Sequence, residues 1–295
     1  MMKRVVQGTS LRVIAALLLA LAWAAGAAAQ QMPQPLTFWS DYVVKPGREA
    51  DFMDLVNKVG APVRDKLLAE GVVLAWGMEV PVNRGAFGPG THTIWYSVAD
   101  WAGIDKVQMA MAAQFQKIAA DEAKAADEAR KKNRVPDKST AERIGDIFDV
   151  SKTRDWITRD LVFVISSAPL PAGFMPYTRY SFTQVKPAKG ADYRAAWEKY
   201  NKPVYDKLVK DGTIAAYGLG VEEVKTTNDF THFTWVAASS LASWDKIRAA
   251  FMADRGARSA EERAAISQTF ANLTEGTASR GLVARSIIFR EASMK

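Results

Sequence analysis

The chain carries one sequence pattern twice, with the second copy 141 residues after the first. The matching segments are VVKPGREADF (43–52) with QVKPAKGADY (184–193), PVRDKLLAEG (62–71) with PVYDKLVKDG (203–212), and AWG (75–77) with AYG (216–218). Segments that keep their order at a fixed separation indicate duplication of one structural unit. The sequence therefore predicts two halves with the same order of helices and strands.

The match continues through the only two histidines of the chain. After a slip of one residue, His92 aligns with His232 and Trp95 with Trp235, both 140 residues apart. Further on, residues 139–144 align with 259–264 at a separation of 120, so the first half holds about twenty extra residues. A duplication explains the paired histidines without any appeal to a shared activity.

Each half has the same expected order of elements, β-α-β-β-α-β. Strands are expected at 38–45, 72–80, 91–98 and 161–166 in the first half, and at 179–186, 214–224, 231–238 and 282–289 in the second. Apolar residues at helical spacing predict a helix before Gly71 and another before Gly212, each ending in a glycine. Pro62 and Pro203 fall inside these helices, so a kink or break is expected there.

The fold class predicted from this order is α+β, with two ferredoxin-like βαββαβ repeats. The strands TIWYSV and FTWVAA are apolar on both faces, so each sheet must cover its own helices and a second apolar surface. The two repeats are therefore expected to pack sheet to sheet as an intramolecular barrel with a pseudo-two-fold axis. The expected bounds are 36–166 for the first repeat, with a helical insertion at about 115–135, then a linker at 167–177 and the second repeat at 178–290.

These features resemble the dimeric α+β barrel superfamily, above all the NIPSNAP, antibiotic-biosynthesis-monooxygenase and EthD-like small domains. The resemblance rests on a strand ending in VKPG, a helix that starts with an aromatic residue (EADF, GADY), a strand led by glycine and an aromatic third strand. It covers nearly all of residues 36–290. Members include cofactor-free oxygenases, haem enzymes and proteins of unknown activity, so the resemblance implies a fold and leaves the function open.

Residues 1–29 are expected to form a signal peptide. Lys3, Arg4 and Arg12 precede an apolar run that ends in alanines at Ala29, which is typical of an exported chain cleaved at that point. The mature protein is then expected to be periplasmic or secreted, with no membrane-spanning segment. It keeps 36 basic and 32 acidic side chains without a basic patch, which argues against nucleic acid as a partner.

His92, His232 and Arg285 are the candidate catalytic residues. A histidine suits proton transfer near neutral pH, although each histidine could instead simply hydrogen-bond a loop. Arg285 is a charge in an apolar strand, which is costly to bury unless it is paired or faces a wet cavity or a ligand. Arg179 and Asp41 raise the same question, and an interior holding all three would suit an oxygenated or anionic ligand.

The candidate ligand-binding residues are aromatic: Trp76, Trp95, Trp235, Tyr180 and Tyr217. Such side chains line pockets for partly hydrophobic ligands, but they are also common in a plain core. No metal site is predicted, because zinc-type sites need three or four suitable ligands and the chain has two histidines and no cysteine. No cofactor is predicted either, while haem ligation by one histidine stays an open alternative.

Three functions follow from these observations. The first is an exported protein that binds a small, partly hydrophobic ligand between the barrel halves, with no assigned catalysis. The second is a cofactor-independent or haem-assisted oxygenase that uses His92 or His232 as base or ligand and Arg285 to hold developing negative charge. The third is a structural or interaction protein that uses the charged helix at 119–134.

Overall fold

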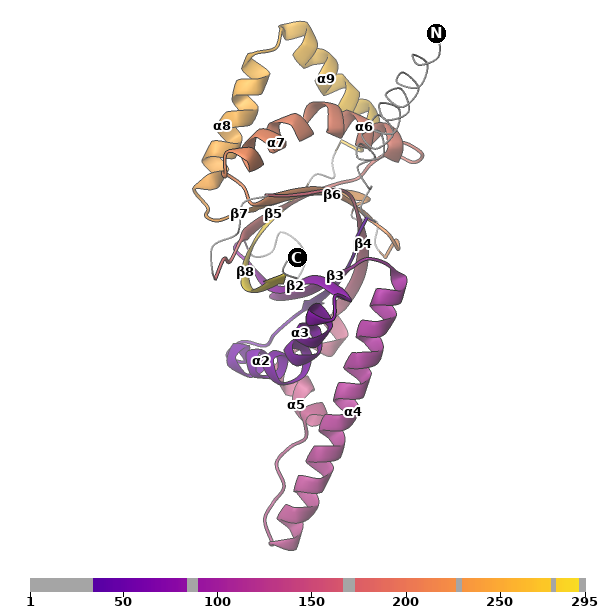
Figure 1. Cartoon of the computed structure of the whole chain (residues 1–295), viewed down its shortest axis with the longest axis vertical. Helices are drawn as coiled ribbons and strands as arrows, with labels where there is room; N and C mark the ends of the chain where they lie inside the picture. The colour runs from indigo at the N-terminus through magenta and orange to yellow at the C-terminus, as the bar shows by residue number, and fades with distance from the viewer. Residues whose placement is uncertain (1–33, 84–89, 167–172, 227–229, 277–279, 292–295) are drawn as a thin grey trace, which may run out of the picture. The chain divides into compact units, whose positions relative to one another are not determined.

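The described strands form one closed antiparallel barrel (Figure 1). The computed structural model describes residues 34–83, 90–166, 173–226, 230–276 and 280–291. The barrel belongs to a compact unit that begins at Pro35. Its eight strands are β1 (Leu36–Tyr42), β2 (Val73–Pro81), β3 (His92–Val98), β4 (Arg154–Ile165), β5 (Tyr177–Thr183), β6 (Ala216–Glu222), β7 (His232–Ala238) and β8 (Arg280–Glu291). The predicted signal peptide at 1–29 and most of the predicted linker at 167–177 lie outside the described residues.

The strand order around the barrel is β1-β3-β2-β8-β5-β7-β6-β4. The first half of the chain supplies the run β4-β1-β3-β2, and the second half supplies β8-β5-β7-β6. The two runs are joined edge to edge by hydrogen bonds between β2 and β8 and between β4 and β6. The predicted α+β class is therefore confirmed, and the expected sheets meet as one continuous barrel rather than as two separate layers.

The proline-containing helices are interrupted as expected. In the first half α2 (Glu49–Leu55) passes through a π-helical turn, η1 (Val56–Gly60), into α3 (Ala61–Ala69). In the second half α6 (Gly190–Tyr200) ends before α7 (Lys202–Lys210) begins. Pro203 stands in the first turn of α7, where a missing N–H breaks no hydrogen bond, and Pro62 follows directly on the π-helical turn.

The insertion in the first half lengthens one helix. That helix, α4 (Trp101–Lys131), continues through the expected insertion, and α5 (Thr140–Ile147) follows it. The shorter counterparts are α8 (Ser243–Gly256) and α9 (Ala260–Leu273). Ser139 and Ser259 each begin the second helix of the pair with a capping box. Among the described residues, no helix has the length and apolar character needed to cross a membrane.

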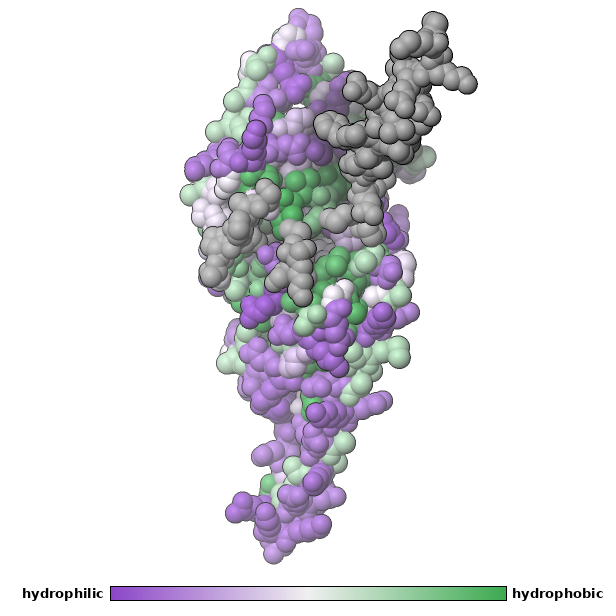
Figure 2. Space-filling model, viewed as in Figure 1, coloured by the Kyte–Doolittle hydropathy of each residue, from purple (hydrophilic) through white to green (hydrophobic). Residues whose placement is uncertain are grey.

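Three hydrophobic clusters divide the core. One lies between the strands and helices of the first half, and a second lies between those of the second half. The third fills the barrel interior and is almost entirely aromatic. Hydrophobic residues accordingly gather around the barrel in Figure 2, whereas the helices on either side present mostly hydrophilic residues. The strands are apolar on both faces because one face packs against the helices and the other faces the barrel interior.

Candidate functional site

A row of polar side chains crosses three neighbouring strands inside the barrel. Asp41 on β1 pairs with Thr93 on β3, and Thr93 in turn pairs with Glu79 on β2. Directly paired residues in a sheet point to the same face. This face is the interior, because Trp39 belongs to the aromatic cluster there and Trp95 packs against it, and each lies two residues from a member of the row. The fold therefore brings two carboxyl groups to the same wall of the barrel.

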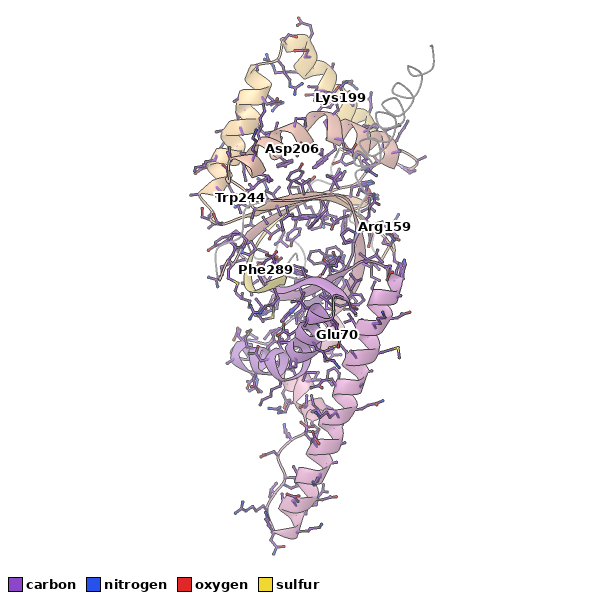
Figure 3. All side chains as sticks on the ribbon, viewed as in Figure 1. Glu70, Arg159, Lys199, Asp206, Trp244 and Phe289 are labelled. Atoms are coloured by element: carbon purple, nitrogen blue, oxygen red, sulfur yellow. The ribbon has the colours of Figure 1, made fainter. Side chains whose placement is uncertain are left out.

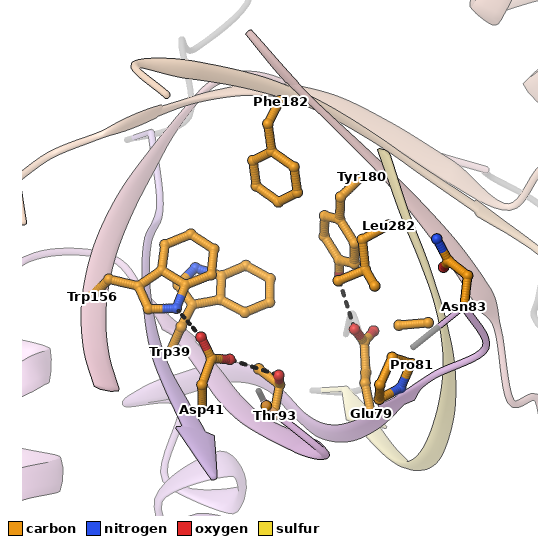
Figure 4. Close-up of a pocket in the computed structure, with 12 residues that line it drawn as sticks. Trp39, Asp41, Glu79, Pro81, Asn83, Thr93, Trp156, Tyr180, Phe182 and Leu282 are labelled. Atoms are coloured by element: carbon orange, nitrogen blue, oxygen red, sulfur yellow. Dashed lines mark hydrogen bonds between the residues drawn. The ribbon is translucent and has the colours of Figure 1, made fainter. Parts of the chain in front are cut away.

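These carboxyl groups open onto a small cavity (Figure 4). The lining residues are Trp39, Asp41, Glu79, Pro81, Asn83, Gly90, Thr93, Trp156, Tyr180, Phe182, Leu282 and Ala284. The cavity has a volume of about 40 Å³, which is room for roughly three water molecules. Trp39 and Trp156 stack with centroids 4.9 Å apart, and Tyr180 meets Trp39 edge-on at 5.7 Å. The walls are thus aromatic except where Asp41, Glu79, Thr93 and Asn83 stand.

Asp41 accepts two hydrogen bonds within this cavity. The Thr93 hydroxyl donates to Oδ1 at 2.7 Å, and the Trp156 indole N–H donates to Oδ2 at 3.1 Å. Burial raises the pKa of Asp41 above its ordinary value of 3.8, and these bonds together with the charge of Arg154 only partly oppose that rise. Two hydrogen-bond donors and the neighbouring Arg154 therefore stabilise the ionised form of Asp41.

Glu79 is the more deeply buried of the two, with 3% of its surface exposed. The Tyr180 hydroxyl donates to Oε2 at 2.9 Å, and the Ser286 hydroxyl donates to Oε1 at 3.4 Å. Burial raises the pKa of Glu79 to about 7, and the hydrogen bonds lower it only in part. The Trp95 indole N–H also lowers this pKa, although its geometry falls short of a formed hydrogen bond. A carboxyl with a pKa near 7 can both give and take a proton at neutral pH.

A third buried carboxyl lies towards the other end of the barrel, away from the cavity lining. The Trp235 indole N–H donates to Oδ1 of Asp160 at 2.9 Å, and burial raises the pKa of Asp160 to about 7. Trp235 also contacts Phe163, with centroids 5.6 Å apart. Asp160 and Trp235 therefore form a separate polar pair inside the barrel.

The two histidines lie outside the barrel interior, between the strands and the helices. His92 contacts the ring of Phe52 on α2 at 5.0 Å, and its Nδ1 lies 3.0 Å from the hydroxyl of Thr91. His232 makes the equivalent contact with Tyr193 on α6 at 5.2 Å, and burial lowers its pKa to about 4. Neither histidine lines the cavity, so their predicted catalytic role has no support from this geometry and stays a prediction.

Of the three charged strand residues, only Asp41 points into the interior. Arg285 on β8 and Arg179 on β5 are exposed on the outside of the barrel. The expectation of an oxygenated or anionic ligand depended on all three pointing inward, and this condition fails. On β8 it is Ala284 and Ser286, on either side of Arg285, that face inward, because Ala284 lines the cavity and Ser286 reaches Glu79.

The predicted aromatic ligand-binding residues divide between the two faces of the sheet. Tyr180 lines the cavity, and Trp95 and Trp235 pack against the interior cluster. Trp76 and Tyr217 face the helices instead. Trp76 donates to Asp65 on α3 at 2.9 Å, and the Tyr217 hydroxyl donates to Asp206 on α7, which Figure 3 labels.

Most residues of the cavity lining were not singled out from the sequence, among them Trp156 and Glu79. A usable signal was present for the last of them, because WGMEVP places one carboxyl in an otherwise apolar strand. That pattern is the one that singled out Asp41 and Arg285.

Replacing His232 by phenylalanine tests its position. We expect His232→Phe to lower the free energy of unfolding by about 1–3 kcal/mol, because the Thr231 hydroxyl loses its hydrogen bond to the imidazole. We also expect the indole NMR signals of Trp39 and Trp156 to stay in place. Urea denaturation and a ¹⁵N spectrum measure these quantities. Displacement of those two signals as large as that caused by Glu79→Gln would contradict the placement of His232 outside the cavity.

The residues present do not fit haem. A proximal histidine needs open space on the iron side of its ring, but both imidazoles are 7% exposed and packed against an aromatic ring. The cavity volume of about 40 Å³ is far below the several hundred Å³ typical of cofactor pockets. In the described part of the chain no cluster of three histidine, aspartate or glutamate side chains could hold a metal ion. We therefore derive no step through haem or a metal.

Comparisons with known proteins bear on the fold only. No protein-family model matches the chain, and no curated protein matches it. Solved structures do match. A protein described as a "putative monooxygenase" from Fusobacterium nucleatum superposes with a TM-score of 0.56 at 10% identity, covering 88% of this chain and 96% of its own. An anthrone oxidase-like protein gives 0.49 at 12% identity, covering 90% and 96%, and a "putative chlorite dismutase" gives 0.44 at 11%, covering 86% and 95%. The chain thus shares the ferredoxin-like α+β barrel fold of the first structure.

Proposed function

We propose that the chain binds a small, partly hydrophobic molecule inside the barrel, at the cavity between Trp39, Trp156 and Tyr180. The observation that carries the proposal is Glu79, a buried carboxyl that faces this cavity with a pKa of about 7. A buried ionisable group is costly to keep, and Glu79 lines the cavity in addition to accepting hydrogen bonds from Tyr180 and Ser286. Convergent polar groups in an aromatic pocket are typical of a ligand site.

The ligand would meet two kinds of surface. The rings of Trp39, Trp156 and Phe182 would cover its apolar part, and Asp41 and Glu79 would hydrogen-bond its polar part. With a volume of about 40 Å³, the cavity takes a molecule of only a few non-hydrogen atoms unless side chains move. Pro81, Asn83 and Gly90 at the margin of the cavity border the connection between β2 and β3.

Binding can be measured without knowing the natural ligand. We expect small alcohols and amides to shift the indole NMR signals of Trp39 and Trp156 in a saturable way, because both rings line the cavity. Glu79→Gln should weaken this binding about tenfold or more for ligands that donate a hydrogen bond to the carboxylate. Glu128→Gln, an exposed carboxyl on α4, is the matched control and should leave binding unchanged. Absence of saturable shifts from every compound in the panel would refute the proposal.

A second candidate function is a cofactor-independent oxygenase. It is favoured by Glu79, since a buried carboxylate of pKa about 7 is suited to remove a proton from a bound acidic substrate. The described resemblance of fold to a protein called a putative monooxygenase agrees with this candidate. The base would then be Glu79 or Asp41 rather than His92 or His232. Oxygen uptake with acidic carbon compounds of a few non-hydrogen atoms, abolished by Glu79→Gln but not by Glu128→Gln, is the test.

Three further parts of the proposal concern the chain as a whole. We propose that it is exported after cleavage near Ala29, that its halves are two ferredoxin-like repeats related by a pseudo-two-fold axis, and that it is related to the NIPSNAP, antibiotic-biosynthesis-monooxygenase or EthD-like domains. The sequence matches at separations of 141 and 140 residues support the repeat. Mass spectrometry of the protein from the expressing cell would identify the first residue, expected at Gln30.

The interaction function assigned to 119–134 remains the third candidate. This segment forms the end of α4 and the residues just after it, and its side chains are mostly exposed. If its deletion changes neither the hydrodynamic size nor the capture of any partner, this candidate fails.

A further inference from the structure

We propose that the cavity selects a small organic cation, such as a primary ammonium group, over neutral or anionic molecules of the same size. The inference rests on the proposed function, because it names the class of ligand for that same cavity. Two carboxyl groups and four aromatic rings surround the space that the ligand would occupy.

The first argument for a cation is the charge of the side chains that line the cavity. Among the described residues that line the cavity, Asp41 and Glu79 are the acidic side chains, and none is basic. The groups that act on Glu79 are the neutral donors Tyr180, Thr178, Ser286 and Trp95. A cation entering the cavity would therefore supply Glu79 with a positive charge that its own surroundings do not provide.

Asp41 has a different set of neighbours. Thr93 and Trp156 donate to it, Arg154 on β4 attracts its charge, and Asp155 on the same strand opposes it. Arg154 thus offsets part of the negative charge at the Asp41 side of the cavity. The Glu79 side is where a cation gains most.

The aromatic rings carry the second step. Trp39, Trp156, Tyr180 and Phe182 line the cavity, and Tyr180 and Phe182 lie with ring centroids 6.2 Å apart. The faces of such rings attract cations through their negative electrostatic potential, most strongly where water is excluded. An anion would meet the same ring faces and two carboxyl groups, and both would repel it.

Binding of a cation is expected to depend on pH, because it releases a proton from Glu79. A bound cation favours the charged form of Glu79, so binding at a pH below 7 should displace the proton that this carboxyl holds. Binding should therefore strengthen about tenfold between pH 6 and pH 8, as the fraction of ionised Glu79 rises. A neutral ligand that accepts a hydrogen bond from the protonated carboxyl should show the opposite dependence on pH.

The test compares methylammonium, methanol and formate, which are similar in size and differ in charge. Each is titrated into the full chain at pH 6, 7 and 8, with the indole NMR signals of Trp39 and Trp156 as the readout. We expect methylammonium to bind at least tenfold more tightly than methanol at pH 8, and formate to cause no saturable shift. Glu79→Gln should remove the preference for methylammonium over methanol, although methanol itself also binds more weakly, and Glu128→Gln should change nothing.

The outcomes separate the inference from the proposed function. If methanol binds and methylammonium does not, or if formate binds most tightly, the cavity is a ligand site but the cation preference is overturned. If no probe gives a saturable shift, both fail. Should Glu79→Gln not fold, Asp41→Asn provides the second variant, and its preference for methylammonium should be weakened less than tenfold because Arg154 already faces that carboxyl.

Discussion

A variant that carries both Glu79→Gln and Asp160→Asn is expected to exceed the parent chain in stability by several kcal/mol at pH 8 and to gain much less at pH 4. Burial raises the pKa of each carboxyl to about 7, from ordinary values of 4.5 and 3.8. The folded state therefore keeps two protons that the unfolded state gives up. Their contribution to stability is complete below about pH 4 and is lost as the pH rises through 7, at about 3 kcal/mol for Glu79 and about 4 kcal/mol for Asp160.

His232 also affects how the stability of the parent chain depends on pH. Burial lowers its pKa to about 4 from 6.5, so its contribution is present above pH 6.5 and is lost as the pH falls towards 4. Between pH 4 and pH 6.5, the stability gained from His232 as the pH rises cancels the stability lost from one of the two carboxyl groups. The free energy of unfolding of the parent should therefore fall most steeply between pH 6.5 and about 7.5, where His232 no longer offsets Glu79 and Asp160.

Urea denaturation at pH 4, 5, 6, 7 and 8 measures this dependence for both chains. Since His232 is present in both, the difference between their free energies of unfolding isolates the two carboxyl groups. Glu128→Gln, with an exposed carboxyl, should give a profile parallel to that of the parent. A difference that stays constant from pH 4 to pH 8 would mean that Glu79 and Asp160 titrate normally, which would also remove the main support for the ligand site.

The order of the elements could be predicted because its signals are local. The VKPG motif marks the end of the first strand in the first half, and Gly71 and Gly212 stand just after α3 and α7 in the left-handed conformation that favours glycine. Pro62 and Pro203 mark the interruptions of the helices for equally local reasons. Each signal acts within one or two turns of chain, so it can be read without knowledge of the tertiary structure.

The site could not be predicted in the same way, because both faces of the strands are apolar. The side chains of HTIWYSV must alternate between the two faces of the strand. The sequence does not show, however, that Thr93 and Trp95 face the interior while His92 and Ile94 face the helices. Register shifts add to the difficulty. They occur between Met78 and Glu79 on β2 and between Asp160 and Val162 on β4, and such a shift changes which residues share a face. The closure of the barrel, which joins residues some 200 positions apart, determines the outcome.

Replacing Gly218 by alanine is expected to destabilise the chain by about 3 kcal/mol. A Cβ at this position would lie 2.4 Å from Nε1 of Trp235 and 2.7 Å from the carbonyl oxygen of Val162. The oxygen belongs to the backbone of β4 and cannot move freely, so the indole must shift. Its hydrogen bond to Asp160 at 2.9 Å would then break and leave a buried carboxyl without that donor. The smaller entropy of the unfolded chain offsets less than 1 kcal/mol of this loss.

The same arrangement occurs in the first half, where Gly77 lies under Trp95. A Cβ at Gly77 would lie 2.8 Å from the carbonyl oxygen of Ile288 and 2.9 Å from the Trp95 ring. The repeated AWG and AYG segments are therefore explained by the tryptophans of the neighbouring strand, which need the space that a side chain would occupy. Gly77→Ala should move the Trp95 indole away from Glu79 as well as lower the stability.

Gly145→Ala on α5 is the matched control, because nothing lies within 4 Å of a Cβ at that position. It should be neutral or stabilise the chain by up to about 1 kcal/mol, as alanine favours a helix over glycine. Combining Gly218→Ala with Trp235→Leu should recover part of the stability relative to the sum of the two single changes, because the smaller side chain no longer needs the space. Strict additivity of the two changes, with the Trp235 indole signal unmoved in Gly218→Ala, would show that the tryptophan does not rest on the glycine. In that case, the close approach of β6 and β7 at Gly218 would not be what positions Trp235 in the barrel interior.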